Sequence, residues 1–119
     1  MNKKIAEYTK AVVDGRPCFH VSLVMDVSPN CDCHGENDVP IVPNVGMFAS
    51  FDPVALDQAC AEAVLAQPAM PNSVLFDQVC ACNEGDHFKR SHPDTEWEVC
   101  LEHAEKLGLG TRRYELVKI

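Results

Sequence analysis

The stretch VGMFASFDPVALDQACAEAVLAQP, residues 45–68, decides the fold, because it joins a strand to a helix across a clear boundary. Its first part, residues 45–50, is short and apolar, as is typical of a strand. Asp52 can accept hydrogen bonds from the free N–H groups of a helix, and Pro53 suits the first helical turn, where its missing N–H costs nothing. Pro68 ends the pattern. We therefore expect a strand followed at once by a helix.

The segments before and after residues 45–68 also show helix and strand patterns. Apolar residues at helical spacing, with Gly15 as a stop, predict a helix over residues 3–14. The apolar run at residues 18–27 predicts a buried strand. Further along, Thr95 and Glu98 match the Ser/Thr-x-x-Glu capping box and predict the start of the last helix.

The remaining segments are less regular. Residues 74–79 fit a short helix or a strand, and residues 80–94 look irregular. The alternation in YELVKI, residues 114–119, predicts a closing strand. The whole order predicts an α/β or α+β fold, with a small sheet of about three or more strands and helices packed on it, in a single layered domain over residues 1–119.

The composition limits the classes of function. Eighteen acidic against ten basic residues give a net charge of -8, a field that repels phosphate backbones and anionic membranes, so we expect no nucleic acid and no membrane partner. The start lacks the apolar run of a signal peptide, and no stretch approaches the roughly 20 apolar residues that cross a bilayer. We therefore expect a soluble, cytoplasmic protein. Seven cysteines in such a chain favour metal binding or thiol chemistry over a disulfide framework.

The chemistry is concentrated in NCDCHGEND, residues 30–38, inside a loop expected over residues 28–43. Loops of that length in small domains are usually functional or disordered. Cys31 and Cys33 are two residues apart, so both sulfurs can converge on one ion, and zinc and iron prefer such ligands. Reduced thiols without a role and a redox-active dithiol are the alternatives.

A tetrahedral site needs more ligands than this pair. His34 is adjacent in the sequence, and a second Cys-x-Cys pair, Cys80 and Cys82, would raise the number of thiolates to the four that structural zinc or a [4Fe–4S] cluster requires. The candidate ligands are therefore Cys31, Cys33, His34, Cys80 and Cys82, and the candidate cofactor is an iron–sulfur cluster or zinc.

Simpler explanations account for the other reactive side chains. Cys60 falls on the apolar face of its expected helix, and Cys100 is expected to pack with Trp97. His87 and His92 are interpreted as surface or capping residues. Phosphate loops, Ser/His/Asp arrangements and dinucleotide fingerprints are absent from the sequence, which argues against a nucleotide-dependent enzyme and leaves enzymatic activity open.

Two long blocks of the sequence resemble a known family. They are MDVSPNCDCHGENDVPIVPNVGMFASFDPVALDQAC, residues 25–60, and DHFKRSHPDTEWEVCLEHAEKLGLGTRRYELVKI, residues 86–119. They look like the C-terminal part of an uncharacterised family of iron–sulfur center proteins, a domain of unknown function often found with ferredoxin modules. The resemblance implies a metal-dependent or electron-transfer role, although the ferredoxin run Cys-x-x-Cys-x-x-Cys-x-x-x-Cys-Pro is absent here. It also implies a sheet that lacks its usual neighbour, so we expect a protein partner or self-association.

The sequence thus predicts a metal- or iron–sulfur-binding domain with a structural or electron-transfer role beside a partner. The alternatives are a thiol redox domain that uses the pair Cys31 and Cys33, and an interaction or assembly domain without a metal.

Overall fold

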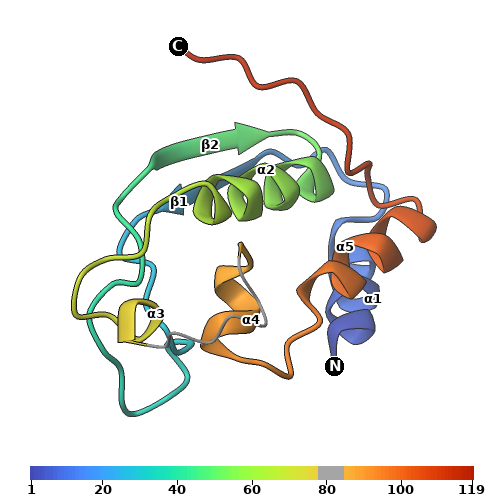
Figure 1. Cartoon of the computed structure of the whole chain (residues 1–119). Helices are drawn as coiled ribbons and strands as arrows, with labels where there is room; N and C mark the ends of the chain where they lie inside the picture. The colour runs from blue at the N-terminus through green and yellow to red at the C-terminus, as the bar shows by residue number, and fades with distance from the viewer. Residues whose placement is uncertain (78–84) are drawn as a thin grey trace. The chain divides into compact units, whose positions relative to one another are not determined.

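The computed structural model describes residues 1–77 and 85–119 and shows a mixed fold of helices and strands (Figure 1). Its elements, in order, are α1 (Asn2–Val13), β1 (His20–Val24), β2 (Gly46–Ser50), α2 (Pro53–Leu65), α3 (Val74–Asp77), α4 (His87–Ser91) and α5 (Trp97–Lys106). By their contacts the residues form two compact groups, which we describe separately. The first group holds residues 1–22, 47–61 and 96–119, and the second holds residues 23–46 and 62–95.

β1 and β2 form an antiparallel ladder. At one end the rings of Phe19 and Phe51 lie 4.9 Å apart, centroid to centroid. At the other end the N–H of Val45 donates to the carbonyl of Val24 at 2.8 Å. The start of the first strand therefore faces the end of the second, which is the antiparallel register.

The expectation of three or more strands is not confirmed. Within the described residues the sheet has two strands, and residues 114–119, the expected closing strand, form neither helix nor strand. Leu116 and Val117 of this segment are 63% and 72% exposed. Alternation alone does not make a strand, because a strand needs an edge to pair with.

Asp52 caps α2 as the sequence predicts. Its Oδ1 accepts hydrogen bonds from the N–H groups of Val54 and Ala55 at 2.9 and 3.0 Å. Its Oδ2 accepts another from the N–H of Thr111 at 2.9 Å, which fastens the segment after α5 to the start of α2. The neighbouring Gly110 lies so close that a Cβ there would overlap the Asp52 carboxylate.

The core of the first group joins α1, α2 and α5. His103 on α5 and Glu7 on α1 add a polar contact, with 3.3 Å between Nε2 and Oε1. The buried residues of this core are Ala6, Val54, Leu101 and Ala104, and packed against them are Trp97, Cys100, Leu107 and Leu109. Cys100 is thus packed into the core, as expected.

The capping box expected at the last helix is not formed. The N-cap of α5 is Glu96, and its side chain makes no capping hydrogen bond. Thr95 instead belongs to the preceding turn, where its N–H donates to the carbonyl of His92 at 2.9 Å. The helix therefore begins later than the sequence pattern predicts.

The second group contains a helix where the sequence looks irregular. α4 is capped by Asp86, whose Oδ1 accepts from the N–H of Lys89 at 3.0 Å. His87 is only 6% exposed, and its Nε2 lies 2.7 Å from the carbonyl oxygen of Gln67, so it is not the surface residue that we expected. Arg90 donates to the carbonyl of Leu75 in α3. These two contacts join α4 to residues that lie 20 and 15 positions earlier in the sequence, and they hold the helix in place. A local sequence pattern does not reveal such contacts.

Candidate thiol site

The loop around the cysteine pair is ordered by one amide side chain, that of Asn37. The Oδ1 of Asn37 accepts from the N–H groups of Asn30 and Asp38 at 3.3 and 3.0 Å. Its Nδ2 donates to the Oγ of Ser28 at 3.0 Å and to the carbonyl of Asn30 at 3.1 Å. Although residues 28–43 contain neither helix nor strand, the part that carries the cysteines has a defined conformation.

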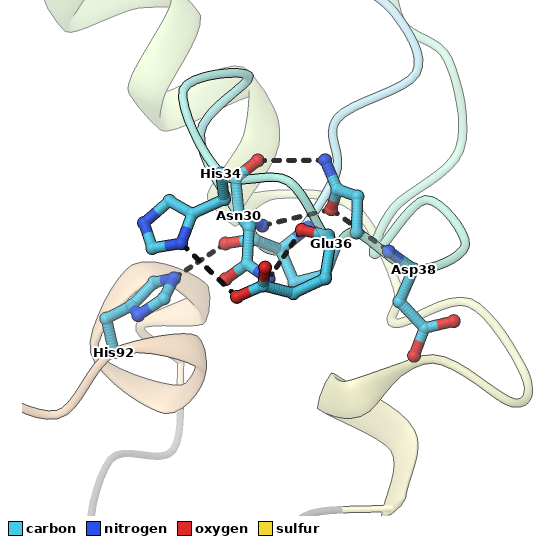
Figure 2. A network of polar contacts seen from close by, with 7 residues as sticks. Asn30, His34, Glu36, Asp38 and His92 are labelled. Carbon is cyan, nitrogen blue, oxygen red and sulfur yellow. Dashed lines mark hydrogen bonds and ion pairs between the residues drawn. The ribbon is translucent and has the colours of Figure 1, made fainter.

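Further contacts fix both sides of this loop. His92, directly after α4, lies with its Nε2 2.6 Å from the carbonyl oxygen of Pro29 (Figure 2). Asp26 adopts a left-handed backbone with φ of 49°, and its N–H donates to the Oδ1 of Asn44 at 2.7 Å. His92 therefore anchors the loop, a role that sequence reasoning missed because the two residues are 63 positions apart.

Cys31 and Cys33 lie in one turn, closed by a hydrogen bond of 2.9 Å from the N–H of His34 to the carbonyl of Cys31. Both cysteines are exposed. The backbone N–H of Cys33 and then its thiol donate to the Cys31 sulfur, and these bonds lower the pKa of Cys31. The same thiol–thiol hydrogen bond raises the pKa of Cys33. The two sulfurs therefore face each other, and Cys31 is the one that ionises first.

His34 belongs to the same turn but faces Glu36. Its Nδ1 lies 3.6 Å from the Oε1 of Glu36, and its side chain is 51% exposed (Figure 2). In residues 1–77 and 85–119, no three His, Cys, Asp or Glu side chains are arranged to hold a metal ion. Cys80 and Cys82, the other candidate ligands, lie outside the described residues.

Two other cysteines differ from this pair in their surroundings. Burial raises the pKa of both Cys60 and Cys100, which keeps them as thiols at neutral pH. The thiol of Cys60 also hydrogen-bonds with Ser22 of β1. Both side chains are half-buried, and among the cysteines of the described ranges only Cys31 combines exposure with a lowered pKa.

The fold and the loop define a small protein of mixed helices and strands with an exposed dithiol turn. Residues 1–62 match the model of the family described as a domain of unknown function, DUF362, and because the match covers more than half of the chain, the chain belongs to this family. A family of unknown function was expected; the link to iron–sulfur centres and the C-terminal position stay predictions. Curated proteins and solved structures give no match. No helix in the described ranges is both long enough and apolar enough to span a membrane.

Proposed function

We propose that this domain binds a soft metal ion or an iron–sulfur cluster through the thiolates of Cys31 and Cys33. The observation that carries the proposal is the contact between the two exposed thiols in a single turn. Metal binding requires thiolates, and the lowered pKa of Cys31 reduces the cost of losing the first proton. Two sulfurs that already face each other can both turn toward one ion with little rearrangement.

The order of the loop supports the same proposal. Asn37 bonds to groups on both sides of the turn, and His92 fastens Pro29, so the pair is held before any ion arrives. A ligand loop that is ordered in advance loses less conformational entropy on binding. This arrangement favours a binding role over a loop that merely carries reduced thiols.

The pair supplies two of the four ligands that zinc or a [4Fe–4S] cluster takes. His34, in the same turn, is a further candidate donor, and Cys80 and Cys82 would complete a set of four thiolates. A zinc ion would give the site a structural role, and a cluster would suit electron transfer with a protein partner.

Protection from alkylation tests the proposal. The chain is reduced, incubated with one equivalent of Zn²⁺ or with a chelator, and treated with iodoacetamide, and each cysteine is then followed by peptide mass mapping. We expect Zn²⁺ to slow the modification of Cys31 and Cys33 strongly and to leave Cys60 and Cys100 unchanged, since these two are half-buried in either condition. Equal rates for the pair with and without metal would refute zinc ligation.

A second candidate function, a dithiol redox domain, is favoured by the opposite pKa shifts of the two thiols. In this reaction the Cys31 thiolate attacks a disulfide of a partner protein and releases one partner thiolate. Cys33 then loses its proton and attacks the mixed disulfide, which forms the Cys31–Cys33 disulfide and releases the second partner thiol. The partner disulfide gains the two electrons that the dithiol loses.

The two candidates differ in one measurable property. The redox function requires the Cys31–Cys33 disulfide to form in a glutathione buffer of defined ratio and to be reversible on adding reductant. Mass spectrometry of the trapped thiols measures this directly. A loop that stays fully reduced across the range of ratios from cytosolic to strongly oxidising excludes the redox candidate and leaves metal binding in place.

A further inference from the structure

Three helices of the first group line a small cavity, which we call the Asp57 notch. Its volume is about 50 Å³, and α1, α2 and α5 each contribute residues at positions i, i+1 and i+4, which fall on one side of a helix. On α5 these are Cys100, Leu101 and Ala104, and on α2 the last of the three is Asp57. The helix sides that meet at this cavity therefore include a carboxylate.

Asp57 interrupts an otherwise uncharged wall. Among the residues that line the notch, all of which the structure describes, it alone carries a charge. Ala6, Val54, Leu101 and Ala104 on the same wall are buried and belong to the core of the first group. A helix position beside such a core is normally apolar. The presence of a carboxylate there therefore calls for a chemical reason.

The carboxylate of Asp57 lacks a counter-ion. Within residues 1–77 and 85–119 it forms no ion pair. Burial by the surrounding side chains raises the pKa of Asp57, and the nearby His20 opposes this rise only in part. Asp57 is nevertheless classed among the exposed residues, so a ligand can reach it. A cation placed in the notch would offset the hydration that the carboxylate has lost.

We propose that the Asp57 notch binds the primary ammonium group of a small alkylamine. Such a group offers three N–H donors, of which the Asp57 carboxylate accepts one or two. Thr9 also lines the notch, and its hydroxyl donates to the carbonyl of Ile5 at 2.9 Å, so its oxygen has lone pairs left to accept another N–H. The alkyl carbons next to the nitrogen would contact the apolar side chains of Leu101 and Ala104.

Size and charge favour this class of ligand. A benzene ring occupies a cavity of about 150 Å³, so a notch of about 50 Å³ has room for an ammonium group and a short alkyl chain and not for an aromatic ring. The net charge of -8 attracts cations and repels anions. Cys31 and Cys33 do not line the notch, so this inference stands or fails independently of the metal site proposed above.

An NMR titration with n-butylammonium chloride, from about 0.1 to 100 mM at constant ionic strength, tests this proposal. The backbone amides of Thr9, residue 57 and Leu101 report binding, and reductant and chelator keep the cysteines reduced and free of metal. n-Butanol has the same chain without the charge, and ammonium chloride has the charge without the chain. Asp57→Asn is compared with Asp14→Asn, the matched control at an acid that does not line the notch and whose side chain is 69% exposed.

We expect n-butylammonium to bind the wild-type chain with a dissociation constant in the millimolar range, as suits so small a ligand. n-Butanol and ammonium should each bind about tenfold more weakly, because each lacks one half of the recognised group. Asp57→Asn should raise the dissociation constant of n-butylammonium by about tenfold, and Asp14→Asn should leave it unchanged. Saturating amine should also lower the pKa of Asp57, followed by the carbon resonance of its carboxyl group, because a bound cation favours the ionised form.

Three results would overturn the proposal. They are the absence of any shift at the notch over the whole series, n-butanol binding as tightly as n-butylammonium, and an equal loss of affinity in Asp57→Asn and Asp14→Asn. Circular dichroism checks that each variant is folded. If Asp57→Asn does not fold, the comparison of the three ligands and the pKa of Asp57 in the wild-type chain decide.

Discussion

The backbone N–H and the thiol of Cys33 both donate to the sulfur of Cys31, so the first cysteine of the motif is the acceptor and the second is the donor. Metal ligands and attacking thiols both have to be thiolates. The contact therefore assigns the two cysteines different behaviour in solution, and this difference can be measured.

The first prediction concerns the pH at which each thiol becomes reactive. The pKa of Cys31 is lowered and that of Cys33 is raised, so alkylation of Cys31 begins at lower pH than that of Cys33. In Cys33→Ala the backbone N–H of residue 33 remains and the thiol donor is lost, so the pKa of Cys31 rises but stays below that of an ordinary cysteine. In Cys31→Ala the pKa of Cys33 falls. Mass mapping after timed alkylation between pH 6 and pH 10 measures, for each cysteine, the pH at which its alkylation rate is half-maximal. Identical midpoints for Cys31 and Cys33 in the wild-type chain would contradict the opposite pKa shifts.

The second prediction concerns the side chain that orders the loop. Asn37→Ala removes the hydrogen bonds to Ser28, Asn30 and Asp38. We expect the free energy of unfolding to fall by only about 1–2 kcal/mol, because at an exposed site water replaces part of the lost bonds. Hydrogen exchange in the loop should become faster, and the affinity for Zn²⁺ should fall. Asp38→Ala, which removes one local bond to the N–H of Val39, is the neighbouring control and should have a smaller effect. Equal exchange rates in the two variants would show that Asn37 does not hold the loop.

The third prediction concerns the close approach between Asp52 and Gly110. Gly110→Ala places a methyl group where the Asp52 carboxylate lies, so the helix cap or the bond to Thr111 has to shift. We expect a loss of about 1–3 kcal/mol in the free energy of unfolding. Gly35→Ala is the control, because a Cβ at that position meets nothing within 4 Å. Urea denaturation measures both, and a Gly110→Ala chain as stable as Gly35→Ala would mean that the contact is absent in solution.

The fourth prediction concerns the buried histidine of α4. His87→Ala leaves a cavity and removes the hydrogen-bonding partner of the Gln67 carbonyl, so we expect a loss of about 2–4 kcal/mol. His87→Gln can still donate to that carbonyl and should recover part of the stability. His34→Ala, at a side chain that is 51% exposed, should leave the thermal midpoint nearly unchanged. If His87→Ala and His34→Ala melt at the same temperature, His87 does not have this structural role.

The elements that the sequence predicts well are those with local causes. The boundary at Asp52 and Pro53 depends on groups within three residues of each other, and the cap is present as expected. Two expectations are wrong. Thr95 does not form a capping box, because the preceding turn takes up its backbone N–H. Residues 114–119 do not form a strand, because a strand has to pair with the edge of a sheet, which the local sequence does not determine.

The candidate site likewise contains residues that the sequence singles out and residues that it does not. Cys31 and Cys33 stand out from composition and spacing alone. Other contacts of the site depend on how the chain folds. Asn37 bonds to groups on both sides of the turn, and His92 contacts Pro29, which lies 63 positions earlier in the sequence. The candidate ligands could be chosen from the sequence, while the residues that position them could not.

Elemental analysis with an absorption spectrum, on protein purified without oxygen, tests the central claim most directly. The wild-type chain is compared with Cys31→Ser, Cys33→Ser and Cys18→Ser, the last as a control at a half-buried cysteine outside the loop. The proposal predicts stoichiometric zinc, or iron with sulfide and a visible absorption band, lost in both loop variants and kept in Cys18→Ser. Folded wild-type protein with no bound metal, which takes up neither zinc nor iron and sulfide when these are supplied, would contradict it.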